Sequence, residues 1–247
     1  MQTTFCFDFG NTRLKCGVFN DGIFKEEIVL EQADKSTIQQ LLDLHKPNKS
    51  ILSSVINHPI EIEELLGQKT RFHKLGHSSK LPFTTPVGNP ETIGADRLAL
   101  CAAAVDLFPH KHNLAIGLGT CITYNYINSS HEFLGGSISP GMNMRFRAMH
   151  EQTALLPLIK AESQFPLIGF DTKTNLLSGV ILGMAKEIDG IIEAYSLKFN
   201  NFNVLLTGGD MGFFESHLKN KIFADPNLIY KGLYAIKIGR ASCRERV

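Results

Sequence analysis

The first half of the chain opens with short runs of alternating apolar and polar residues, separated by turn residues such as Asn20-Asp21-Gly22. Alternation with a period of two predicts β-strands, whereas apolar residues spaced three or four apart predict helices. The pattern predicts strands at 3–8, 15–19, 23–30, 51–56 and 71–75 and helices at 38–44, 60–66 and 97–108. Residues 76–93, rich in Gly, Pro, Ser and Thr, are expected to form a long functional loop.

The second half of the chain restarts the same order of elements. The pattern predicts strands at 114–118, 121–127, 133–138 and 204–207, with helices between the last two, the clearest at 179–199. A meander of strands followed by alternating helices and strands, performed twice, predicts a duplicated α/β fold with a cleft between its halves. We expect the halves to cover residues 1–108 and 109–237.

Amino-acid composition, net charge and cysteine spacing restrict the kind of protein that this chain can be. The chain has 247 residues, 43% of them hydrophobic and 20% charged, which is typical of a globular protein of one or two domains. A net charge of +1 predicts neither nucleic acid nor a membrane surface as a partner, and no apolar stretch is long enough to cross a bilayer. The five cysteines are scattered without a CxxC pair, which indicates a reducing cytoplasm.

The last residues of the chain differ from what precedes them. Residues 238–247 become basic and lose periodicity, and they look like the translated read-through of a sequencing adapter. We therefore expect a non-native tail, with a genuine disordered tail as the alternative.

Two glycine turns join neighbouring predicted strands in matched contexts. The first is Asp8-Phe9-Gly10-Asn11-Thr12, and the second is Gly117-Leu118-Gly119-Thr120. A tight hairpin of this kind directs backbone N–H groups and a hydroxyl toward a phosphate. Two such hairpins facing each other would bind a nucleotide between them, which points to a phosphoryl-transfer enzyme.

The first turn also carries charged side chains. A carboxylate at a strand end, here Asp8, is suited to a hydrated Mg²⁺ that bridges nucleotide phosphates. Gly10 allows close approach of the backbone, while Thr12 and Lys15 can supply a hydroxyl and a positive charge. The alternative is an Asx-type turn with an incidental lysine.

A third phrase, Gly94-Ala95-Asp96-Arg97, stands where the long loop meets the Ala-rich helix. Asp96 beside an arginine is a candidate base for a primary hydroxyl. The alternative is that Asp96 only caps the helix. Asn caps as well as Asp but cannot accept the proton, so Asp96→Asn separates the two interpretations.

Two further glycine-rich phrases follow predicted strands. Gly135-Gly136-Ser137-Ile138-Ser139-Pro140-Gly141 fits either a close approach of the backbone to a ligand or a bend in a strand. Thr207-Gly208-Gly209-Asp210 fits either an adenosine site or a tight turn before a helix.

Taken together, these phrases resemble type III pantothenate kinase, a member of the superfamily that includes acetate and sugar kinases and actin. The resemblance runs from about Thr3 to Ile236. It implies a duplicated ribonuclease H-like (actin-like ATPase) fold and ATP-dependent phosphorylation of pantothenate, the first step of coenzyme A synthesis. It also implies a homodimer, Mg²⁺ and a monovalent cation such as K⁺ or NH₄⁺.

The resemblance assigns roles to individual residues. By this likeness Asp96 is the general base, and Asp8 is the aspartate associated with Mg-ATP. The residues implied to bind ATP are Asp8, Gly10, Asn11, Thr12, Lys15, Thr120, Gly208 and Gly209. The residues implied to bind pantothenate are Val87, Gly94, Ala95, Asp96, Arg97 and Thr172.

Three positions depart from the family pattern. Gly117 stands where the family usually has an aspartate that holds the monovalent cation, and Asn125 replaces another frequent acid. Val87 stands where many members have a tyrosine that packs on pantothenate. These departures keep two alternatives open: a weakly active or inactive nucleotide-binding regulator, and a kinase for another small molecule.

Overall fold

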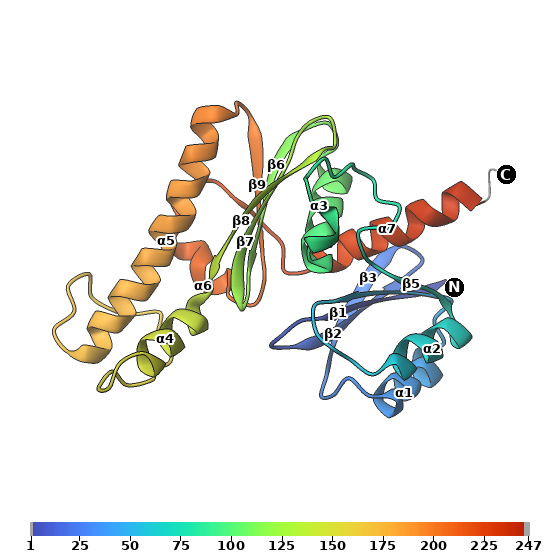
Figure 1. The fold of residues 1–247 in the computed structure, drawn as a ribbon, viewed down its shortest axis with the longest axis horizontal. Coiled ribbons are helices and arrows are strands. Elements are labelled where there is room, and N and C mark those ends of the chain that lie inside the picture. Colours follow the sequence, from blue (N-terminus) through green and yellow to red (C-terminus); the bar gives the residue numbers. More distant parts are fainter. Residues whose placement is uncertain (1, 245–247) are drawn as a thin grey trace. The chain divides into compact units, whose positions relative to one another are not determined.

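The computed structural model describes residues 2–244, and the side chains of residues 2–238. These residues form two compact units (Figure 1). The first unit holds residues 2–110, 127–134 and 227–244, and the second holds Lys111–Tyr126 and Gly135–Pro226.

The first unit is built on a five-stranded sheet in the order β3-β2-β1-β4-β5. The meander of β1 (Thr3–Phe9), β2 (Leu14–Asn20) and β3 (Ile23–Leu30) is antiparallel. Strands β4 (Lys49–Ser54) and β5 (Arg71–Lys74) extend the sheet in parallel with β1. The β1–β4 register places Asp8 beside Ser53, so the turns that follow β1 and β4 emerge at the same edge.

Helices cover both faces of this sheet (Figure 1). On one face, α1 (Lys35–His45) and α2 (Ile60–Lys69) pack against the Phe side chains of β1. On the other, α7 (Leu228–Arg244) contacts β1 and β4 and packs along α3 (Ala95–Leu107). The short helix η1 (Pro90–Thr92) precedes α3.

The second unit repeats the strand order of the first. Its sheet runs β10-β9-β6-β7-β8, in which every strand has a counterpart in the first sheet. The strands are β6 (His112–Leu118), β7 (Cys121–Ile127), β8 (Phe133–Pro140), β9 (Phe202–Thr207) and β10 (Phe223–Ala224). As in the first unit, the central strand pairs in parallel with the strand that follows its meander, β6 with β9. The prediction of a duplicated α/β fold is confirmed.

The helices of the second unit are α4 (Met142–Glu151), α5 (Thr172–Lys198), α6 (Met211–Phe214) and η2 (Glu215–His217). The buried face of α5 packs with α4 and α6 against β6, β7 and β9. Helix α5 begins seven residues before the predicted position 179, because Asp171 and Thr174 form a reciprocal capping box. Within residues 2–244, no helix is both long and apolar enough to span a bilayer.

The predicted boundaries of the halves and the predicted tail remain predictions. Helix α7, which follows the second sheet in sequence, belongs to the first unit. It continues through Arg244, so residues 238–244 of the expected tail lie within its backbone and 245–247 lie outside the described residues.

Candidate active site

Asp8 lies at the end of β1, partly buried, directly opposite Lys15 on β2. Burial raises the pKa of Asp8 to about 7, and the negative charge of Asp96 adds to the shift while Lys15 opposes it. The turn that follows is closed by a 3.1 Å hydrogen bond from the Gly10 N–H to the Arg13 carbonyl. Asn11 and Thr12 at its tip are exposed.

Lys15 is held beside Asp8 by an ion pair. Its Nζ lies 2.9 Å from Glu27 Oε2, which also accepts a 2.8 Å hydrogen bond from the Tyr230 hydroxyl. Burial acts to raise the pKa of Glu27, but the hydrogen bonds from Lys15 and Tyr230 outweigh it and lower the pKa. An ionised Glu27 therefore orients the lysine on the strand next to Asp8.

Asp96 is the second residue of α3, whose N-cap is Gly94. Asp96 therefore does not occupy the N-cap position, although its carboxyl group accepts hydrogen bonds from N–H groups of the first turn. The carboxyl group folds back over Gly94, with Oδ1 2.5 Å from the position a β-carbon there would take. Burial raises the pKa of Asp96, although N–H groups of the first turn and the Arg97 charge oppose the shift. The two acidic groups predicted from the sequence are thus electrostatic neighbours.

The other predicted pantothenate-binding residues of this unit lie around the start of α3. Ala95 is buried, and the Arg97 guanidinium lies 5.6 Å from the centre of the Phe133 ring. Val87 is partly buried in the loop before η1, whose course is fixed by a bridge between Thr84 and Glu132.

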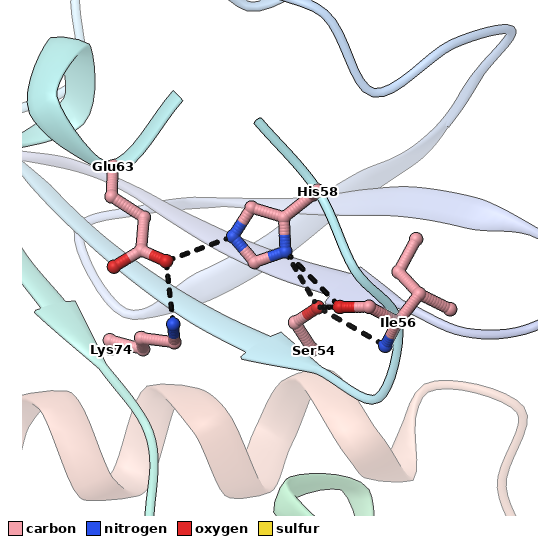
Figure 2. Close-up of polar contacts among 5 residues, drawn as sticks. All are labelled: Ser54, Ile56, His58, Glu63 and Lys74. Atoms are coloured by element: carbon pink, nitrogen blue, oxygen red, sulfur yellow. Dashed lines mark hydrogen bonds and ion pairs between the residues drawn. The ribbon is translucent and has the colours of Figure 1, made fainter. Parts of the chain in front are cut away.

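A polar cluster that the sequence analysis missed lies just after β4 (Figure 2). The His58 ring joins the Ser54 hydroxyl to Glu63, and Glu63 also binds Lys74. These residues come from the β4 end, α2 and β5. Their spacing gives no periodic or motif signal, because only the tertiary fold brings them together.

In the second unit, the predicted phosphate hairpin is the two-residue turn Gly119-Thr120 between β6 and β7. Both residues are exposed. The Gly141 N–H donates a 3.0 Å hydrogen bond to the Thr120 carbonyl. A β-carbon on Gly141 would lie 2.1 Å from the Gly119 carbonyl oxygen, so only glycine allows this approach. The glycine-rich exit of β8 therefore supports the hairpin itself.

The second glycine-rich phrase also contacts this hairpin. Gly208 has φ +107°, and a β-carbon on it would lie 2.1 Å from the Leu118 carbonyl oxygen. The Asp210 N–H donates a 3.2 Å hydrogen bond to the same carbonyl. The phrase forms a tight turn between β9 and α6, with Gly209 exposed beside it. Thr120, Gly208 and Gly209 therefore belong to one set of turns at the end of the sheet.

Four elements around the β8 exit are tied together by Glu187 of α5. The Tyr124 hydroxyl donates to Glu187 Oε1 at 3.1 Å, and Ser139 and Arg145 also donate to this carboxylate. The Arg145 Nε–H binds the Pro140 carbonyl at 2.8 Å. This second missed cluster fixes the chain immediately before Gly141.

Gly117 and Asn125 lie in the sheet beneath the second hairpin. Gly117 is in β6 and pairs with Thr207 of β9. Asn125 is fully buried, and its Nδ2 donates to the Ala115 carbonyl at 3.1 Å and to Thr123 Oγ1 at 3.2 Å. A neutral amide donor thus satisfies these two oxygens.

Thr172, the remaining substrate candidate, is the exposed first residue of α5. The residues before it include exposed apolar side chains, Leu167, Ile168 and Phe170.

Solved structures define the class of fold. A protein from Campylobacter jejuni described as a Baf family transcriptional activator matches with a TM-score of 0.61 and 22% identity, covering 96% of this chain and 99% of that one. The activator of 2-hydroxyisocaproyl-CoA dehydratase from Clostridium difficile, solved with bound ADPNP, matches with a TM-score of 0.55 and 11% identity, covering 99% and 98%. At these identities the likeness shows a shared fold, that of actin-like ATPases.

Sequence comparison identifies the family. The profile of the type III pantothenate kinase family matches residues 4–194. The type III pantothenate kinase of Christiangramia forsetii is 39% identical over 231 residues, which cover 92% of this chain and 94% of that protein. The chain therefore belongs to the type III pantothenate kinase family, and the resemblance inferred from its motifs is confirmed.

Proposed function

We propose that this protein transfers the γ-phosphoryl group of ATP to pantothenate and so catalyses the first step of coenzyme A synthesis. Family membership supports the reaction. The structural observation that carries it is the pair of neighbouring carboxyl groups, Asp8 at a phosphate turn and Asp96 in the first turn of a helix. One is suited to a cation on the phosphates and the other to the acceptor alcohol.

In the proposed step, the pantothenate hydroxyl oxygen forms a bond to the γ-phosphorus while the bond to the bridging oxygen of ADP breaks. The hydroxyl proton passes to Asp96. Burial raises the pKa of Asp96, which makes its carboxylate a stronger base than an exposed one. Because phosphoryl transfer has a loose transition state, the carboxylate acts mainly by orienting the hydroxyl.

Asp8 fits a role in holding Mg²⁺. Its pKa is raised by burial and by a second carboxyl group, so a cation nearby would relieve both effects. Across residues 2–244, no group of three or more His, Cys, Asp or Glu side chains could hold a metal ion alone. We therefore assign the ion to Asp8 together with phosphate oxygens, where it would neutralise charge on the transferred group.

We assign the remaining predicted residues as follows. Gly10, Asn11, Thr12 and Lys15 contact the phosphates from the first turn, and Thr120 contacts them from the second. Gly208 and Gly209 offer bare backbone to the adenosine. Gly94, Ala95, Arg97, Val87 and Thr172 bind pantothenate.

We propose that a monovalent cation, K⁺ or NH₄⁺, has little influence on this protein. Gly117 supplies no carboxylate, and the Asn125 amide donates to two oxygens that could otherwise face a cation. A buried amide N–H satisfies such oxygens without adding charge.

We also propose that the protein is a cytoplasmic homodimer. The exposed Leu167, Ile168 and Phe170, immediately before Thr172, support an interface because neighbouring exposed apolar residues favour association. Cys6, Cys16, Cys101 and Cys121 are free, which is consistent with a reducing compartment. Light scattering after size-exclusion chromatography measures the oligomeric state, and Phe170→Asp should shift it toward monomer.

The decisive experiment compares Asp96→Asn with Asp106→Asn, which changes an exposed aspartate on the same helix. We expect Asp96→Asn to lower kcat at least 100-fold in a coupled ADP-release assay, while Mg-ATP affinity stays unchanged. Asp106→Asn should match the wild type. Near-wild-type turnover by Asp96→Asn would disprove the base assignment.

The missing carboxylate at position 117 favours one alternative, a nucleotide-binding regulator descended from a kinase. No turnover with pantothenate under any cation, with ATP still bound, would support it. Turnover only with another hydroxylated acceptor would instead identify a different small-molecule kinase.

A further inference from the structure

The segment that follows β4 runs beside the first phosphate turn. The parallel pairing of β1 and β4 places Phe9 next to Ser54. The Val55 N–H then donates a 3.0 Å hydrogen bond to the Phe9 carbonyl, one residue before Gly10. Any displacement of this segment is therefore transmitted directly to the residue that begins the phosphate turn.

The same segment contacts the start of α3. The Val55 Cγ1 atom lies 3.9 Å from the position that a β-carbon on Gly94 would take. Gly94 is the N-cap of α3, and Asp96 folds back over it. Val55 thus lies between the turn that follows Asp8 and the helix start that presents Asp96.

His58 fixes the far end of this segment. Its Nδ1 lies 3.0 Å from the Ser54 hydroxyl, and its Nε2 lies 3.0 Å from Glu63 Oε1 (Figure 2). The ring also packs edge-on against Phe9, with centroids 5.6 Å apart. Only 4% of the His58 side chain is exposed. Its Nδ1 also lies 3.4 Å from the Ile56 carbonyl oxygen, so three polar contacts and one aromatic contact define its orientation.

Glu63 and Lys74 provide the anchor for His58. Lys74 Nζ lies 2.6 Å from Glu63 Oε1, the oxygen that also contacts His58. Burial acts to raise the pKa of Glu63, but Lys74 and His58 outweigh it and lower the pKa. The ionised Glu63 thus accepts a hydrogen bond from the His58 Nε2–H, which leaves Nδ1 facing Ser54.

We propose that His58 is a positioning residue for phosphoryl transfer. It touches no substrate. Glu63 and Lys74 hold its ring, and the ring in turn holds the segment around Val55 that follows β4. This segment sets the spacing between the phosphate turn and Asp96. The inference rests on the proposed function for its kinetic effect. Its structural basis does not depend on the substrate, because His58 is a buried histidine that contacts β1, the end of β4 and α2.

Two substitutions separate the contacts of His58. His58→Phe keeps the packing on Phe9 but removes the polar contacts with Ser54, Ile56 and Glu63. His58→Gln keeps a donor toward Glu63 and loses the contact with Ser54. The matched control is His45→Phe, since the His45 ring packs against Phe5 on the same strand, 5.5 Å between centroids, away from the turn.

We expect His58→Phe to lower kcat about tenfold and to weaken Mg-ATP binding several-fold, because a small misplacement of reacting groups is costly. His58→Gln should lie between this variant and the wild type. His45→Phe should leave both quantities unchanged. All assays are run at a temperature where circular dichroism shows each variant fully folded.

A purely structural role for His58 predicts a lower Tm with kcat and Mg-ATP affinity within twofold of the wild type, and that result would overturn the proposal. Mg-ATP binding by calorimetry needs no turnover. If the wild type itself fails to phosphorylate pantothenate, the proposed function fails, while the binding difference between His58→Phe and His45→Phe still decides the positioning role.

Discussion

The two sheets share one strand order, and they differ in the residue near the end of the central strand, just before the glycine turn. In the first, Asp8 is the second-to-last residue of the central strand and pairs with Ser53. In the second, the equivalent residue of β6 is Gly117, which pairs with Thr207. Both strands lead into a glycine turn. The turn after β1 covers residues 10–13 and the turn after β6 covers only Gly119-Thr120, and a carboxylate precedes the first turn alone.

The supports of the two turns differ as well. The first turn is backed by side chains, through His58 and the Lys15–Glu27 ion pair. The second is backed mainly by close backbone approaches at Gly141 and Gly208. We infer that the first unit supplies charge for the reaction and that the second supplies a fixed backbone surface. Substitutions in the two units should therefore have different effects.

The largest expected effect is on activity in the first unit. Asp8→Asn removes the carboxylate assigned to Mg²⁺, and we expect a loss of roughly 100-fold or more in kcat/KM for Mg-ATP. ADP release measured over a Mg²⁺ series checks this. Asp43→Asn, an exposed change on α1, is the control. If Asp8→Asn retains a normal Mg²⁺ response, the assignment of the ion to Asp8 is wrong.

The same variant should be more stable than the wild type without ligands. The pKa of Asp8 is about 7 in the folded protein against 3.8 as the ordinary value, so between these pH values the unfolded chain is ionised and the folded one is not. Wild-type stability therefore falls as pH rises from about 4 to about 7. The advantage of Asp8→Asn should be smallest near pH 4 and reach about 4 kcal/mol above pH 7. A pH-independent difference in Tm would contradict this account.

The second unit should respond to bulk at its turns. Gly208→Ala places a β-carbon against the Leu118 carbonyl at a positive φ, so we expect a loss of about 3 kcal/mol, or roughly 6–12 °C in Tm. Gly209→Ala is the matched control, because nothing lies within 4 Å of its β-carbon position. Equal Tm values for the two variants would show that the close approach is unimportant.

Much of this architecture is readable from sequence because it is local. The strands predicted at 23–30 and 121–127 have the bounds of β3 and β7. The sequence predicts the start of α5 seven residues too far along the chain, because the first turn is polar and depends on the Asp171 capping box rather than on an apolar stripe. The position of α7 was not predicted, because its packing on α3 depends on a contact between Gly232 and Ala99, distant in sequence.

The residues of the candidate site also fall into two groups, those that lie in sequence motifs and those that only tertiary contacts bring together. Asp8 and Asp96 lie in motifs, so the sequence could propose them as site residues, and the charge of Asp96 raises the pKa of Asp8. His58 and Glu187 lie in no motif, and their partners come from several elements. Residues that support a site through tertiary contacts leave no spacing for sequence analysis to detect.

The smallest expected effect tests the comparison most directly. Gly117→Asp restores the carboxylate at the position equivalent to Asp8. Gly117 is a strand residue outside the positive-φ glycines of the described chain, so its backbone conformation is one that other residues adopt. We expect Gly117→Asp to make ADP release depend on K⁺, with activity several-fold higher in K⁺ than in its absence, because an unpaired carboxylate near phosphates repels them.

The wild type should be nearly indifferent to K⁺. The measurement is a K⁺ titration at constant ionic strength, with choline as the replacement cation. If wild type and Gly117→Asp show the same K⁺ response, position 117 does not set the cation requirement, and the asymmetry between the two turns has no electrostatic role.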